Sequence, residues 1–179
     1  MSLEDYKKII KFTALEEKIS ELFDIPSDML IPFFLSIKYG GDWSTKNDES
    51  FSVAVKDRET IYNPQIKEGE SLETIYLLVN PRIITREGKV HRIEKCGLSD
   101  ERELVQRPYN TKISIEKGLI AVIEPKKKLI KLKKLDKENL EFKGSLAFSV
   151  EHELEHVSPE DKLSPRKPIW NFSYVFDRD

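Results

Sequence analysis

Two of the three histidines in this 179-residue sequence have the spacing of a metal site. His152 and His156 lie four residues apart in His-Glu-Leu-Glu-His. Residues at positions i and i+4 of a helix share a face, so both imidazoles can bind one ion. Glu153 follows the first histidine, where a carboxylate can act as the general base for a metal-activated water. A solvated, glutamate-rich helix can carry the same pattern by chance, so the motif alone leaves both interpretations open.

A catalytic metal ion held by two histidines needs at least one more protein ligand and an open position for water or substrate. No histidine or cysteine follows His156. The only cysteine, Cys96, lies upstream between Lys95 and Gly97. A lone cysteine is commonly a small buried apolar side chain, but these neighbours are more typical of a loop or a strand end. The carboxylates downstream of the histidines, which no motif marks, are Glu160, Asp161, Asp177 and Asp179.

The histidines fall within a predicted helix from Ser145 to Val157. Its apolar side chains would surround a bound ion and strengthen the electrostatics there. Ser158-Pro159 ends the helix, because the residue before a proline disfavours helical backbone. The apolar residues of this helix include Leu146, Phe148, Val150, Leu154 and Val157.

The remaining elements predict an α+β fold. Two amphipathic helices come first, over residues 2–23 and 29–39, and Gly40-Gly41 ends the second. A polar loop over residues 42–50 follows. Short runs of β-forming residues predict strands at 51–55, 74–79, 82–85, 91–96, 111–116, 119–123, 129–135 and 169–176, with a turn at 63–71. We expect one domain over residues 1–179, with short, mostly antiparallel strands packed around the late metal-binding helix.

Composition excludes several classes of protein. The chain is 39% hydrophobic and 35% charged with a net charge of −2, so it is neither disordered nor a globally basic DNA-binding protein. No apolar run approaches the ~20 residues that a membrane span needs. The first residues, Met1 to Asp5, lack the basic start of a signal peptide, which predicts a cytoplasmic protein. A single cysteine excludes an internal disulfide and a multi-cysteine zinc framework.

Four sequence elements, taken in order, resemble the peptide deformylase family. That family carries an Asn-Pro-x-Ile element, an E-G-C-L-S motif, an Arg-Pro pair and an H-E-x-D-H motif. The similarity covers about residues 74–158, under half of the chain. The matching segments are Asn80-Pro81-Arg82-Ile83, Glu94-Lys95-Cys96-Gly97-Leu98-Ser99, Arg107-Pro108 and His152-Glu153-Leu154-Glu155-His156.

The resemblance implies one divalent metal ion, Fe²⁺ or Zn²⁺, held by Cys96, His152 and His156. It implies Glu153 as general acid and base, and the backbone N–H of Leu98 as a donor to the oxyanion. The implied reaction removes the formyl group from N-formylmethionyl peptides or nascent chains through a metal-activated water. A thiolate ligand raises electron density on the ion, which tunes the acidity of that water. The expected lining of a methionine pocket is Phe148, Leu98 and Ile83.

The sequence also departs from the family pattern. Gly97 separates the cysteine from Leu98-Ser99, so either Cys96 or Gly97 occupies the ligand position. We favour Cys96, because the Glu-x-Cys spacing is kept and glycine is easily inserted in a tight turn. The family's G-x-G-x-A-A-x-Q motif, whose glutamine donates to the oxyanion, is not recognisable after Gly40-Gly41. Glu155 stands where the family has aspartate, one methylene shorter and better able to hold its usual contact.

These departures keep two other interpretations open. One is a catalytically impaired deformylase fold that works as a binding or regulatory module. The other is a zinc protease whose third ligand is a downstream carboxylate. The segment Lys126 to Lys134 could contact the ribosome, although an exposed edge strand protected by lysines explains it more simply. His91 and the tryptophans Trp43 and Trp170 are interpreted as structural, with Trp43 also a candidate for lining a substrate cleft.

Overall fold

The computed structural model describes residues 14–96, 101–135, 139–158, 166–169 and 172–175. Within them the helices lie where the sequence predicts them. The first predicted helix is seen from residue 14 onward, because residues 1–13 lie outside the described part. The helical elements are α2 (Ala14–Phe23), the 3₁₀ turn η1 (Ser27–Leu30), α3 (Ile31–Tyr39) and α4 (Ser145–Val157). Gly40 ends α3 with a φ of 72°, a backbone conformation that favours glycine.

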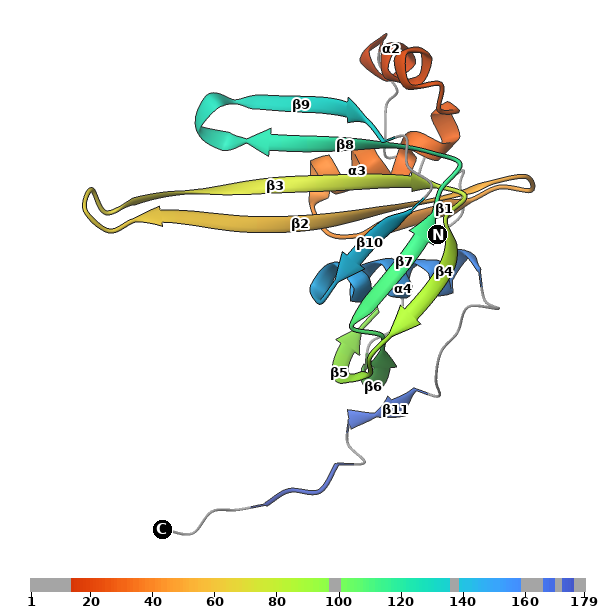
Figure 1. Cartoon of the computed structure of the whole chain (residues 1–179), viewed down its shortest axis with the longest axis vertical. Coiled ribbons are helices and arrows are strands. Elements are labelled where there is room, and N and C mark those ends of the chain that lie inside the picture. Colours follow the sequence, from red (N-terminus) through yellow and green to blue (C-terminus); the bar gives the residue numbers. More distant parts are fainter. Residues whose placement is uncertain (1–13, 97–100, 136–138, 159–165, 170–171, 176–179) are drawn as a thin grey trace.

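The largest sheet has five antiparallel strands in the order β1-β2-β3-β8-β9. Its central hairpin, β2–β3, extends well beyond the body of the protein (Figure 1). A short 3₁₀ turn, η2 (Pro125–Lys127), joins the last two strands. The strands are β1 (Trp43–Lys46), β2 (Phe51–Asn63), β3 (Glu68–Val79), β8 (Lys117–Glu124) and β9 (Leu129–Lys134).

Two three-stranded antiparallel sheets complete the fold, in the orders β10-β7-β4 and β11-β6-β5. Few helices and mostly antiparallel strands confirm the predicted α+β class. No helix among the described residues is long and apolar enough to cross a membrane. The strands are β4 (Arg82–Glu87), β5 (Val90–Lys95), β6 (Arg102–Arg107), β7 (Asn110–Ser114), β10 (Leu140–Lys143) and β11 (Lys167–Pro168).

The five-stranded sheet buries apolar side chains on both faces, because successive residues of a strand point to opposite sides. Ala54 of β2 packs in the cluster that holds Ile19 of α2 and Phe33 of α3. Its neighbour Val53 packs in the other cluster, with Val150 of α4. Helix α4 thus lies on the face opposite α2 and α3, where it also contacts β1, β6 and β10. This position brings the His-Glu-x-x-His segment next to β5 and β6.

Three predictions for the strands were wrong. The polar loop contains β1, which pairs with β2 although its sequence, Trp-Ser-Thr-Lys, shows little apolar alternation. Strands β2 and β3 have 13 and 12 residues, at least twice their predicted lengths, and residues 64–67 alone form their turn. The predicted closing strand at 169–176 is replaced by β11, and residues 172–175 form no strand. The sequence also missed β6 and β10.

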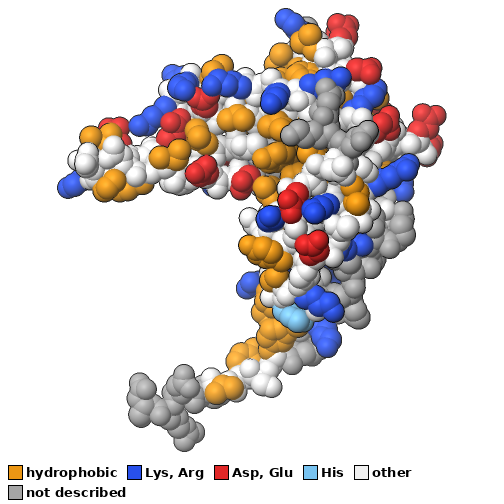
Figure 2. All heavy atoms as spheres, viewed as in Figure 1, with side chains coloured by type: hydrophobic (Ala, Val, Ile, Leu, Met, Phe, Trp, Pro, Cys, Tyr) orange, Lys and Arg blue, Asp and Glu red, His pale blue; other side chains and the backbone are white. Residues whose placement is uncertain are grey.

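The lysine-rich segment is an edge strand, as predicted. Strand β9 lies at the end of the five-stranded sheet. Lys127 and Lys131 both pair with Glu124, and Lys126 pairs with Glu68, so part of its positive charge is neutralised locally. Figure 2 shows basic, acidic and apolar side chains intermixed over this extended part of the sheet. A ribosome contact through this segment stays a prediction.

Candidate metal centre

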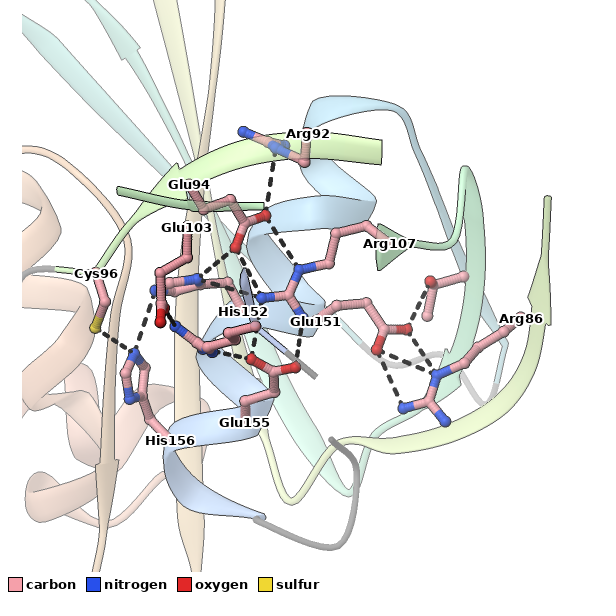
Figure 3. Close-up of polar contacts among 12 residues, drawn as sticks. Arg86, Arg92, Glu94, Cys96, Glu103, Arg107, Glu151, His152, Glu155 and His156 are labelled. Carbon is pink, nitrogen blue, oxygen red and sulfur yellow. Dashed lines mark hydrogen bonds and ion pairs between the residues drawn. The ribbon is translucent and has the colours of Figure 1, made fainter. Parts of the chain in front are cut away.

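The structure brings the three predicted metal ligands together (Figure 3). Cys96 directly follows β5, and the two histidines lie one turn apart on α4. The Sγ atom of Cys96 lies 3.4 Å from Nε2 of His156, which lies 3.2 Å from Nε2 of His152. One potential ligand atom from each residue lies within 4.8 Å of the other two. Cys96 is buried, His152 is half-buried and His156 is exposed, so the cluster opens to one side.

These distances fit a tetrahedral ion. Metal–nitrogen bonds of about 2.0–2.1 Å and a metal–sulfur bond of about 2.3 Å place neighbouring ligand atoms roughly 3.3–3.6 Å apart. The measured separations of 3.2 Å and 3.4 Å are close to that range. One thiolate and two imidazoles suit zinc or ferrous iron, and three protein ligands leave a fourth position for water or substrate. The donor set that the described residues supply therefore fits a metal ion.

Glu94 of β5 orients the first histidine. Its Oε2 atom lies 3.0 Å from Nδ1 of His152, on the side of the ring away from His156. A carboxylate at this position accepts the Nδ1–H proton and leaves Nε2 free to bind a metal. Burial alone would raise the pKa of Glu94, but hydrogen bonds from His152 and Arg107 outweigh it and lower the pKa to about 2. Glu94 is therefore a permanent anion that fixes the ring.

Arg107 links Glu94 to the metal helix. Its side chain is 1% exposed and donates to both carboxylate oxygens of Glu94, at 3.1 Å and 2.8 Å. It also donates to both oxygens of Glu155 on α4, at 2.7 Å and 3.0 Å. Burial lowers the pKa of Arg107, but the two carboxylates raise it by more. Glu155 thus holds a bidentate contact to Arg107.

Glu153 lies in a different environment. It is 7% exposed, and Ser44 of β1 donates a hydrogen bond of 2.7 Å to its Oε2 atom. Among the described residues, no arginine or lysine pairs with Glu153. Burial raises its pKa, opposed by the Ser44 hydrogen bond and by the charge of His152 and helped by the charge of Asp42. A raised pKa makes the Glu153 carboxyl a better proton acceptor, which suits a general acid and base.

A cavity of about 320 Å³ adjoins His152 and Glu153. This volume is at the lower end of the range for small-ligand sites. Phe148 lines it as predicted, whereas Ile83 does not and packs instead in the core beneath α4. The lining is more polar than a methionine pocket requires. Its members are Asp42, Arg92, Ile93, Glu94, Lys95, Phe148, Ser149, His152 and Glu153.

Several predicted residues can be placed only in part. Leu98 and Gly97 lie outside the described residues, as do Trp170 and the four downstream carboxylates. The thiol of Cys96 joins the cluster, as the favoured register requires. His91 is exposed, with its Nε2 atom 3.1 Å from Nε2 of Gln106, and is not part of the cluster. Trp43 packs against Ile31 and Leu35, in line with a structural role.

Sequence reasoning missed the residues that support the ligands. Glu94 and Arg107 were noticed as parts of motifs, but their pairing could not be foreseen across strands β5 and β6. Ser44 lies in a segment interpreted as a loop. Arg166, which donates to Glu155 at 2.7 Å, stands in no motif. The one available signal was that Glu94, Arg107 and Glu155 each belong to one of the motifs that resemble the family.

No protein-family model matches this chain, and a search of curated proteins finds no similar one. The function is therefore inferred from the residues of the site.

Proposed function

We propose that the protein is a metal-dependent hydrolase that resembles peptide deformylase and removes the formyl group from N-formylmethionyl peptides. The observation that carries this proposal is the convergence of Cys96, His152 and His156, with Glu153 on the same helix turn. A structural zinc site needs no adjacent base, whereas a hydrolytic one does. The ordered sequence elements that resemble the family support the same substrate.

A divalent ion held by the three ligands would polarise the formyl carbonyl and make water a stronger nucleophile. Glu153 would accept a proton from the attacking water and return it to the amine nitrogen as the C–N bond breaks. Water and the formamide are thereby converted to formic acid and an amine, which ionise to formate and an ammonium group, and the Glu153 carboxylate is restored. Ser44 would hold the Glu153 carboxyl in place during both transfers. The N–H of Leu98, implied by the resemblance, would stabilise the oxyanion.

The cavity supports a small substrate group at this position. Phe148 and Ile93 supply apolar surface, and Arg92 and Lys95 supply positive charge. The guanidinium of Arg92 stacks over the Phe148 ring, 4.6 Å from its centroid, and also pairs with Glu94. Contacts with Phe148 and with Glu94 therefore fix the position of the Arg92 side chain. The apolar surface of Phe148 and Ile93 would suit a peptide with an apolar first side chain.

A second function, a binding or regulatory module without catalysis, is favoured by one observation. The residues that follow Gly40-Gly41, over 42–50, supply no glutamine. The loss of one oxyanion donor typically costs ~10²–10³ in rate. The hydrolase is therefore expected to be slow.

The test is formate release from formyl-methionyl peptides by protein loaded with iron, zinc or nickel. The matched substrate control is the acetyl-methionyl peptide. We expect Glu153→Gln to abolish most of the activity and Glu21→Gln, on the exposed face of α2, to leave it unchanged. Metal-loaded protein without activity would favour the module, and activity that survives Glu153→Gln would overturn the role of Glu153.

A further inference from the structure

Arg166 connects the end of the chain to the metal helix. It immediately precedes β11, which pairs with β6 through Lys167 and Leu104. The guanidinium donates to Oε2 of Glu155 at 2.7 Å and to Oε2 of Glu103 at 3.1 Å. The Arg166 side chain is 28% exposed. The side chain of the residue just before a two-residue strand thus reaches a buried carboxylate on α4.

An unbroken series of hydrogen bonds runs from Arg166 to a metal ligand. Arg166 binds Glu155, Glu155 binds Arg107, Arg107 binds Glu94, and Glu94 binds His152. Glu155, Arg107 and Glu94 are all at least nine-tenths buried. In such surroundings each contact restricts the rotamers of its neighbours and is electrostatically stronger than in water.

Arg166 and Arg107 donate to the same oxygen of Glu155, Oε2, so the loss of Arg166 would affect the other contacts in the series. If Arg166 is removed, the Glu155 carboxylate can rotate, and Arg107 can follow it away from Glu94. Glu94 would then hold the imidazole of His152 less firmly. Loss of a residue that hydrogen-bonds a metal ligand directly, as Glu94 does, typically costs 10–100-fold in metal affinity.

We infer that Arg166 is a positioning residue for the metal centre, acting through Glu155, Arg107 and Glu94 on the orientation of His152. This inference rests on the proposed function, because it needs a metal at Cys96, His152 and His156. It gives the short strand β11 a role at the metal centre, because the pairing of β11 with β6 places Arg166 beside Glu155.

Helix α4 offers a matched control. Arg86 of β4 pairs with Glu151, a buried carboxylate one turn before Glu155. The Arg86 side chain is also 28% exposed. Glu151 additionally accepts a hydrogen bond of 2.8 Å from Thr111, and this cluster contains no metal ligand. Arg86→Ala should therefore loosen α4 without acting on His152.

The experiment measures Zn²⁺ affinity of the full chain by competition with a chelating indicator. We expect Arg166→Ala to bind Zn²⁺ about tenfold more weakly, Arg166→Lys to recover part of the loss, and Arg86→Ala to match the wild type. The visible spectrum of the Co²⁺-loaded protein, which reports ligand geometry, should change in Arg166→Ala alone. Urea unfolding of the metal-free variants separates this effect from stability.

The outcomes are distinguishable. Wild-type protein that binds no Zn²⁺ overturns the proposed function. Wild-type binding with an unchanged or tighter affinity in Arg166→Ala overturns the inference and leaves the proposed function standing. Equal weakening in Arg166→Ala and Arg86→Ala also overturns it, because the effect would then come from general loosening of the helix.

Discussion

Helix α4 buries glutamates at three alternate positions, and the surroundings of the middle one differ from those of the other two. Glu151 and Glu155 share a face and each contacts an arginine, Arg86 or Arg107. Glu153 projects to the other side, since residues two apart on a helix diverge by about 200°. It accepts a hydrogen bond from a serine hydroxyl, that of Ser44.

The difference separates a glutamate that holds the helix in place, Glu155, from one that is a candidate for proton transfer, Glu153. Burial would raise the pKa of Glu155, but Arg107 and Arg166 lower it, so this carboxylate stays charged and holds the helix in place. Burial raises the pKa of Glu153, and only a hydroxyl and a histidine oppose the shift. One helix thus carries arginine-paired carboxylates on one side and, on the other, a carboxyl group whose pKa is raised.

The largest effect is expected at Arg107, where two buried carboxylates meet. Arg107→Met leaves Glu94 and Glu155 without their shared cation, which should cost about 3–5 kcal/mol in the free energy of unfolding. Urea unfolding of the metal-free protein measures this. Arg58→Met, on the exposed part of β2, is the control and should cost about 1 kcal/mol or less. Similar small losses for both would mean that the buried network does not hold the helix.

Replacing Glu153 should lower the catalytic rate without lowering the stability of the protein. Glu153→Gln should lower the rate of deformylation by ~10²–10⁴ because the proton carrier is lost. Stability should be unchanged or increased, because a neutral amide is easier to bury than a carboxylate. Glu151→Gln, by contrast, should destabilise the protein without a direct effect on the site. Kinetics and thermal unfolding of both variants test the contrast, which fails if the two behave alike.

Acid should weaken the anchoring side of the metal-free protein. The pKa of Glu94 is about 2 in the folded chain and ordinarily 4.5, so the unfolded state binds the proton more readily. Its contribution to stability is complete above about pH 5 and is lost as the pH falls toward 2. Urea midpoints between those values measure the slope. Glu94→Gln should flatten it, and an equally steep slope in that variant would assign the acid sensitivity to other groups.

The smallest effect is expected at Ser44. Its hydrogen bond lowers the pKa of Glu153, so Ser44→Ala should raise that pKa. The acidic limb of the rate profile should then move to higher pH, with less than a tenfold loss at the optimum. Ser44→Thr keeps the hydroxyl and should preserve the wild-type profile. An unshifted limb in Ser44→Ala would show that the hydroxyl does not tune the base.

How far the sequence predicts this protein depends on whether a pattern is local. Helix α4 was predicted with its observed bounds, because its apolar residues recur at helical spacing and Ser158-Pro159 ends it. Strand β1 and the outer halves of β2 and β3 were not, since they show little apolar alternation and gain their stability from the neighbouring strand.

The same limit applies to the site. The pair His152 and His156 is readable from one helical turn, and Cys96 from a motif that resembles a known family. The partners that orient them come from β5, β6 and the residue before β11, and only the pairing of these strands brings them together. Contacts such as the one between Arg166 and Glu155 carry no sequence signature.

Metal analysis of the purified full chain beside Cys96→Ser tests the central claim most directly. The account predicts about one transition metal ion per wild-type chain, lost in the variant while the fold is retained by circular dichroism. A wild-type chain that stays metal-free after exposure to Zn²⁺ and Fe²⁺, or a variant that keeps its metal, would contradict it.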